Sequence, residues 1–236
     1  MKKNIFTTGI IDGIPIAMGY LAVSFSFGIA AVAAGLSPVE AIIISMTNLT
    51  SAGQFAGINI ITSGGSYFEL GLSQFFINIR YSLMGISLSQ KLDKAFKPLH
   101  TLLLGHALTD EIYAVAVSRV KPIRPLYFFG LALLPYLGWA AGTAAGAFLG
   151  QLLPDMLASA LSVAIYGMFI AIIIPAVKAD VKVAVITAIA IFISCILYYL
   201  PAFDVISNGF SIIICSVLAS VVGAIIFPVK EENENE

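Results

Sequence analysis

Long apolar runs are the feature that most restricts how this chain can fold. Two of them, Val183–Leu200 and Ser211–Phe227, contain no charged residue. A helix needs about 20 apolar residues to cross the hydrocarbon core of a bilayer, whereas the strands of a membrane barrel alternate apolar and polar residues. Only 11% of the 236 residues are charged, against roughly 25% in soluble domains. The sequence therefore predicts an all-α membrane protein.

The chain divides into about eight hydrophobic segments. They are Pro15–Gly35, Val39–Thr62, Phe68–Gln90, Leu99–Ser118, Leu126–Leu152, Met156–Val177, Val181–Leu200 and Asn208–Phe227. The connections are too short for a soluble domain, so residues 1–236 are predicted to form a single transmembrane domain, a polytopic helical bundle with six to eight crossings. Ile14-Pro15 and Gly19-Tyr20 are weakly echoed by Leu134-Pro135 and Gly138-Trp139. Because transporters often contain internal repeats, we take 9–120 and 125–230 as candidate repeat halves.

The basic residues predict that both chain termini are cytoplasmic. With eight crossings, Lys91, Lys94 and Lys97 lie outside and eight other basic residues lie inside. If the second and fourth segments are re-entrant, each returning to the face from which it came, all eleven basic residues other than Arg80 lie inside. The charge distribution alone does not decide between these topologies.

Polar residues interrupt the second segment. Asn48, Thr50, Ser51 and Gln54 place hydrogen-bonding side chains among small residues. Because polar groups are costly in hydrocarbon, they must face protein or a wet cavity. The pattern is typical of an interrupted helix whose exposed backbone and half-helix ends bind a polar ligand. Close packing of helices through small residues would explain the same pattern.

The third segment is predicted to be a central helix because it is polar on two sides. Asn78 and Tyr81 share one face, and Arg80 lies on nearly the opposite one. Arg80 is about mid-segment, too deep to reach the surface easily, and it needs an anion. That anion is either a substrate carboxylate or a protein carboxylate. The candidate protein partners are Asp110, Glu111 and Glu69.

Thr109-Asp110-Glu111 is a strong helix-start signal inside the fourth segment. It predicts two half-helices that meet near Thr109. His106 aligns with Asp110 and Tyr113 only if the helix is continuous. A carboxylate held in the membrane can take up and release a proton during a transport cycle. Alternatively, the two acids simply begin a short interfacial helix.

In their order along the chain, these motifs resemble those of the AzlC family, the large subunits of bacterial branched-chain amino acid exporters. The matching stretches are Gly13–Tyr20, Gln54-Phe55, Asn78–Tyr81, Thr109–Glu111 and Tyr136–Gly146. Tyr81 stands where the family usually has histidine, and Thr50–Gly53 departs from the family's order of small residues. Since the ordinary pKa of tyrosine is about 10, Tyr81 suits a proton shuttle at neutral pH poorly.

The resemblance implies a multi-pass protein of the bacterial cell membrane that exports branched-chain or similar apolar amino acids together with a small AzlD-like membrane subunit. We expect proton antiport. The candidate substrate-binding residues are Asn48, Thr50, Ser51, Gln54, Asn78, Arg80 and Tyr81, and the candidate proton-coupling residues are Asp110, Glu111 and His106. A passive channel or pore subunit for small zwitterions would use the same polar segments.

Other classes of function find little support. The chain has no Walker, His-Glu-x-x-His or Gly-x-Ser-x-Gly motif, so we expect neither an enzyme nor direct ATP-driven pumping. Cys195 and Cys215 lie within apolar runs and are expected to pack there, without a disulfide framework or metal site. We expect no cofactor, and the net charge of −1 suggests no nucleic-acid partner.

Overall fold

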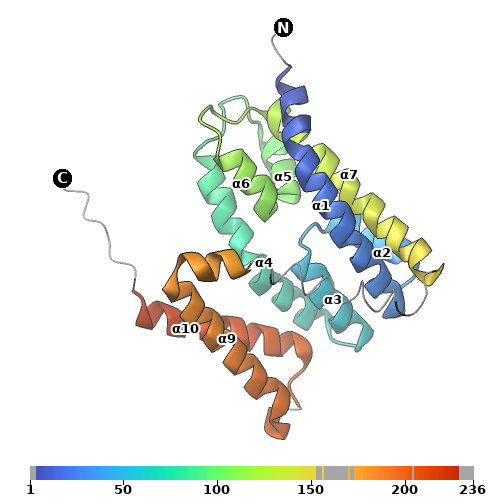
Figure 1. Cartoon of the computed structure of the whole chain (residues 1–236), viewed down its shortest axis with the longest axis vertical. Coiled ribbons are helices and arrows are strands. Elements are labelled where there is room, and N and C mark those ends of the chain that lie inside the picture. The colour runs from blue at the N-terminus through green and yellow to red at the C-terminus, as the bar shows by residue number, and fades with distance from the viewer. Residues whose placement is uncertain (1–3, 153–155, 157–169, 171–172, 204, 229–236) are drawn as a thin grey trace. The chain divides into compact units, whose positions relative to one another are not determined.

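The computed structural model describes residues 4–152, 156, 170, 173–203 and 205–228, and all the regular elements in these residues are helices. This result confirms the all-α prediction (Figure 1). The chain forms two compact units. Unit 1 comprises residues 1–58 and 77–165, and unit 2 comprises residues 59–76 and 166–236. The predictions of a single domain and of repeat halves 9–120 and 125–230 stay predictions.

The described residues form the following helices along the chain. They are α1 (Ile5–Ala33), α2 (Pro38–Thr47), α3 (Ala52–Thr62), α4 (Tyr67–Ser89), α5 (Pro98–Ala107), α6 (Asp110–Val117), α7 (Pro125–Leu149), α9 (Val181–Tyr199) and α10 (Asn208–Ile226), with short 3-10 turns at Gly150–Leu152 and Pro201–Phe203. Residues 173–179 are also helical.

Four helices in the described part of the chain are long and apolar enough to cross a membrane: α1, α7, α9 and α10. By this criterion, the described residues contain fewer spans than the predicted six to eight. The second and fourth segments are each broken into half-helices of 8 to 11 residues. The third segment forms α4, whose 23 residues are long enough but include polar and charged side chains. The sixth segment, Met156–Val177, lies mostly outside the described residues.

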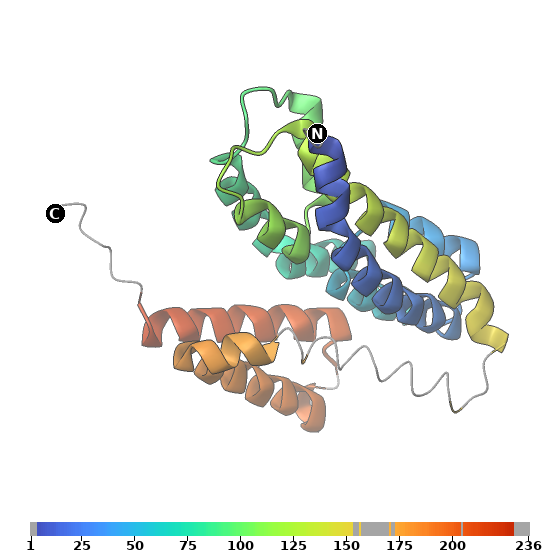
Figure 2. The ribbon, with the colours of Figure 1, turned by 45° about the horizontal axis from the view of Figure 1, so that its top comes forward.

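Helices α1 and α7 pack side by side and in parallel along most of their length (Figures 1 and 2). Near their beginnings, a Cβ on Gly9 would lie 2.2 Å from the Tyr127 carbonyl oxygen; near their ends, one on Gly146 would lie 1.9 Å from that of Phe25. Only glycine allows such an approach of two backbones, which is how small residues join membrane helices. The pair spans roughly 40 Å at 1.5 Å per residue. The positions of the other helices of unit 1 can be described along its length.

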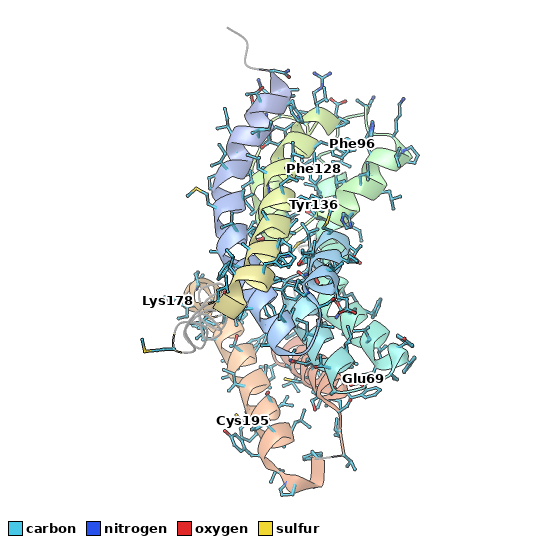
Figure 3. All side chains as sticks on the ribbon, turned by 90° about the vertical axis from the view of Figure 1, so that its right-hand side faces the viewer. Glu69, Phe96, Phe128, Tyr136, Lys178 and Cys195 are labelled. Carbon is cyan, nitrogen blue, oxygen red and sulfur yellow. The ribbon has the colours of Figure 1, made fainter. Side chains whose placement is uncertain are left out.

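Helices α5 and α6 form a hairpin that begins and ends at the same end of the α1–α7 pair. Near the start of α5, the His100 ring lies 5.8 Å from that of Phe129, early in α7; near its end, His106 lies 6.1 Å from Tyr136, halfway along α7. The chain then returns along α6, because Arg119 just beyond it contacts Asp12, near the start of α1. In Figure 3, Phe96 and Phe128 mark this end of the unit.

Backbone hydrogen bonds join the connection before this hairpin to the one that follows it. Asp93 donates to the Ile123 carbonyl and Ile123 donates to that of Lys91, each at 2.9 Å, and the Lys91 amine reaches the Val117 carbonyl at 2.5 Å. The two connections therefore lie at one face, and the fourth segment folds back to the face from which it came. We call helices α5 and α6 the second hairpin, because another hairpin precedes them in the chain.

Helix α2 and residues 52–58 of α3 form a first hairpin that enters from the opposite end. From that end α2 runs to the middle of α7, where the Tyr136 hydroxyl donates to the Met46 carbonyl at 3.0 Å. Helix α3 then turns back, since Phe55 stacks against Phe27 and Ile58 packs beside Ala31, towards the end of α1. Of the two topologies that the charges left open, these contacts fit the re-entrant one.

Local sequence explains where the half-helices begin. At the start of α2, Ser37 and Glu40 cap each other's backbone N–H groups in a capping box, with Pro38 in the first turn. At the start of α6, the Thr109 hydroxyl accepts from the Ile112 N–H. The helix bounds confirm the predicted interruptions, which fall at residues 48–51 and 108–109, and the Thr109 cap lies at the second of them.

In unit 2, α9 and α10 pack against each other, and a Cβ on Gly223 would lie 2.8 Å from Ile186. The first part of α4 joins the start of α10 through Glu69. This buried carboxylate accepts from the Ser207 hydroxyl and, at 3.1 Å, from the Gly209 N–H. Glu69 therefore pairs with the start of α10 and is no partner of Arg80, which belongs to unit 1.

Candidate functional site

The breaks of the two hairpins both lie near the middle of the α1–α7 pair. Tyr136, the twelfth of 25 residues in α7, contacts both hairpins: its hydroxyl binds the end of α2 and its ring faces His106 near the end of α5. Two half-helices therefore end here, and α3 and α6 begin here. Unpaired backbone groups at such ends attract ions, anions at N-termini and cations at C-termini.

A cluster of charges occupies the break of the second hairpin. Arg80 on α4 forms an ion pair with Asp110 at 2.7 Å. The guanidinium group also donates to the Tyr81 hydroxyl at 3.2 Å and lies 4.9 Å from the centre of that ring. The structure thus realises the protein-carboxylate alternative for Arg80. Both charged side chains remain partly accessible, at 42% and 33%.

Tyr20, halfway along α1, connects this cluster to the long helices. Its buried hydroxyl donates to Glu111 at 2.6 Å and lies 2.5 Å from the Thr109 hydroxyl. Its ring packs edge-on against Trp139 of α7 at 5.1 Å. With one basic and two acidic side chains, Arg80, Asp110 and Glu111 carry a formal charge of −1. The cluster therefore favours a cation or a proton.

The break of the first hairpin contains no ionisable side chain. Gln54 donates through Nε2 to the Ser45 hydroxyl at 3.1 Å, and Ser45 pairs with Thr143 of α7 at 2.7 Å. Asn48 accepts from the backbone and the hydroxyl of Thr50, which closes a local turn. Ser51 has a positive φ of 50°, a sparsely populated backbone conformation that occurs at functional sites.

Two buried polar atoms at this break, Ser51 Oγ and Gln54 Oε1, have no hydrogen-bond partner within the described residues, and neither has Trp139 Nε1 on α7. Gln54 and Trp139 are only 1% and 2% exposed. Trp139 shares a narrow face of α7 with Tyr136 and Thr143, the two residues that bind α2. Because most buried polar groups are paired, these three atoms call for an explanation.

The structure brings the predicted residues together in two groups. Arg80, Tyr81, Asp110 and Glu111 lie at the second break, and Asn48, Thr50, Ser51 and Gln54 lie at the first. Asn78 is on α4, half-buried. His106 is exposed on the other side of the interruption, where its ring faces Tyr136. The alignment of His106 with Asp110 required a continuous helix, and the break removes that geometric basis.

Four residues of the site were not predicted as site residues: Tyr20, Ser45, Trp139 and Thr143. Tyr20, Trp139 and Thr143 lie in the stretches that resemble the AzlC family, whereas Ser45 is a single hydroxyl within an apolar run, a signal too common to single out. The described residues contain no group of three or more acidic, His or Cys side chains placed to hold a metal ion.

Comparison with known proteins places this arrangement in context. The family model described as AzlC protein matches residues 15–153. The chain is 34% identical over 142 residues to an uncharacterized membrane protein of Archaeoglobus fulgidus, covering 60% of this chain and 61% of that one. It is 28% identical to the inner membrane protein YgaZ of Escherichia coli over 142 residues, 58% of each chain. The matches thus span about three-fifths of these relatives, and no solved structure matches.

Proposed function

This chain belongs to the AzlC family of membrane proteins, and we propose that it is a secondary transporter that exports branched-chain or similar apolar amino acids in exchange for protons. The observation that carries this proposal is the pair of opposed hairpins whose polar breaks meet halfway along α1 and α7. Each hairpin closes the path to the middle from one face. Movement of either one would expose the same polar centre to that face, as alternating access requires.

The charges of the centre suit a zwitterion. An amino acid must have both its charges satisfied when it leaves water. The ammonium group would bind at Asp110 or Glu111, where the formal charge is −1. A carboxylate would compete with Asp110 for Arg80, or it would bind at the half-helix that begins after Ser51. Asn48, Thr50, Gln54, Asn78 and Tyr81 would orient the ligand.

Exchange follows from competition for the same carboxylates. If a proton and the substrate ammonium bind the same group, they cannot leave together, and the release of one permits binding of the other. Asp110 and Glu111 are the proposed proton carriers in this scheme, with His106 as a further proton acceptor on the other side of the interruption. The choice of branched-chain substrates and of a small AzlD-like membrane subunit as partner rests on family resemblance.

Efflux from cells loaded with labelled leucine, isoleucine or valine tests this proposal, measured with and without the small subunit. We expect saturable efflux that falls when the proton gradient is collapsed and that is lost in Asp110→Asn and Glu111→Gln variants that insert normally. Thr47→Ala is the matched control, because this exposed hydroxyl bonds only within its own helix. Flux that neither saturates nor responds to pH would instead identify a passive channel.

A further inference from the structure

We propose that the start of α3, together with Ser51 and Gln54, is the subsite that binds the substrate's carboxylate. This inference rests on the proposed function and assigns one half of the zwitterion to one hairpin. It separates the carboxylate from Arg80, the only cationic side chain among the charged groups at the two breaks.

Arg80 is already bound by other side chains of the protein. Its guanidinium group is paired with Asp110 at 2.7 Å and donates to Tyr81. A carboxylate that bound Arg80 would have to displace Asp110 and leave that acid without its partner, close to Glu111. Because Glu111 already adds a negative charge to this cluster, binding a third carboxylate there is electrostatically unfavourable.

The half-helix ends point to the other break. The first turn of α6 carries its own acids, Asp110 and Glu111, which already complement its positive end. The first turn of α3 contains no acidic residue, so its positive end is available to an external anion. Helix α3 has 11 residues, long enough to have a macrodipole whose positive end lies at this break.

Buried polar atoms without a hydrogen-bond partner within the described residues also lie at the start of α3. The buried Gln54 presents one end of its amide without a partner within the described residues. Oxygen and nitrogen of an amide are interchangeable in a hydrogen-bond network, so the free end of Gln54 can also donate while its other end bonds Ser45. Ser51 adds a hydroxyl. Donors around the positive end of a helix suit a carboxylate.

Binding of leucine and of leucinamide to the purified full-length protein tests the assignment, because leucinamide keeps the ammonium group and side chain but lacks the carboxylate. We expect Gln54→Leu to weaken leucine binding at least about tenfold, while leucinamide binding changes less than about twofold, since the substitution removes a hydrogen bond to a charged group. Thr47→Ala is expected to change neither.

Gln54→Glu provides a test that does not depend on removing a side chain. Its carboxylate would sit in the first turn of α3 and occupy the subsite itself, so leucine binding should be lost while the protein stays folded and binds leucinamide. Equal losses for both ligands in these variants, or unchanged leucine binding, would overturn the subsite. If the wild-type protein binds neither ligand, the proposed function itself fails.

Discussion

The first hairpin holds its break with neutral groups, Ser45, Gln54 and Thr143, whereas the second holds its break with the charges of Arg80, Asp110 and Glu111. Both hairpins consist of two half-helices that return to their own face, and both meet α7 at Tyr136. The charged break is internally paired, while the neutral one keeps polar atoms without partners. The same backbone device therefore supports two different kinds of binding group.

The largest expected effect concerns the faces to which the hairpins open, and it is all-or-none. In a variant lacking Cys195 and Cys215, we expect Lys94→Cys and Lys121→Cys to react with a membrane-impermeant thiol reagent from one side only, the same side. Val39→Cys, before the first hairpin, should react only from the other side. Labelling of Lys94→Cys and Lys121→Cys from opposite sides would show that the fourth segment crosses the membrane.

Removing a charge at the second break should destabilise the protein more than any neutral substitution at the first break. Asp110→Asn leaves Arg80 without its partner, and an unpaired charge in the membrane costs about 2.5–3.5 kcal/mol. Thermal unfolding in detergent would measure the loss. The double variant Arg80→Gln/Asp110→Asn should recover part of it, with a coupling energy of about 0.5–3 kcal/mol. Additive losses would mean that the ion pair does not stabilise the protein.

The glycine contacts between α1 and α7 should contribute equally to the stability of both hairpins, because both pack against these helices. Gly146→Ala would place a Cβ against the Phe25 backbone, so we expect a loss of about 1–3 kcal/mol from overpacking. Gly19 is the matched control on the same pair of helices, since a Cβ there would meet nothing within 4 Å. Gly19→Ala should leave the unfolding temperature unchanged or raise it.

The smallest effect is expected at the neutral break. Ser45→Ala removes the hydroxyl that joins Gln54 to Thr143, and a neutral hydrogen bond contributes about 0.5–1.5 kcal/mol. The same thermal unfolding measurement applies. A loss as large as that of Asp110→Asn would show that the first hairpin depends on its polar contacts as strongly as the second depends on its charges.

The interruptions of the hairpins could be predicted from sequence because their causes are local. Thr109 caps the helix that it precedes, and the polar run from Asn48 to Ser51 breaks the helix before it. The direction in which each chain returns could not be predicted. That direction depends on contacts with α1 and α7, such as Ser45 with Thr143, which lie 98 residues apart.

The partners of charged residues were only partly predictable. Sequence reasoning offered Asp110, Glu111 and Glu69 for Arg80, and the structure pairs it with Asp110. Glu69 and Arg80 are on the same helix, yet Glu69 binds the start of α10. Periodicity places a residue on a face of its helix, but it does not reveal which distant element covers that face.

The contact between Ser45 and Thr143 also limits how early the first hairpin can be completed during synthesis. Residue 143 leaves the ribosome 98 residues after residue 45, a delay of about 5–20 s at typical rates of synthesis. During that time the polar tip of the first hairpin has no α7 to bind, so Ser45 gains this partner only after α7 has been made. Helix α7 thereby completes the hydrogen bonds of a segment that is synthesised well before it.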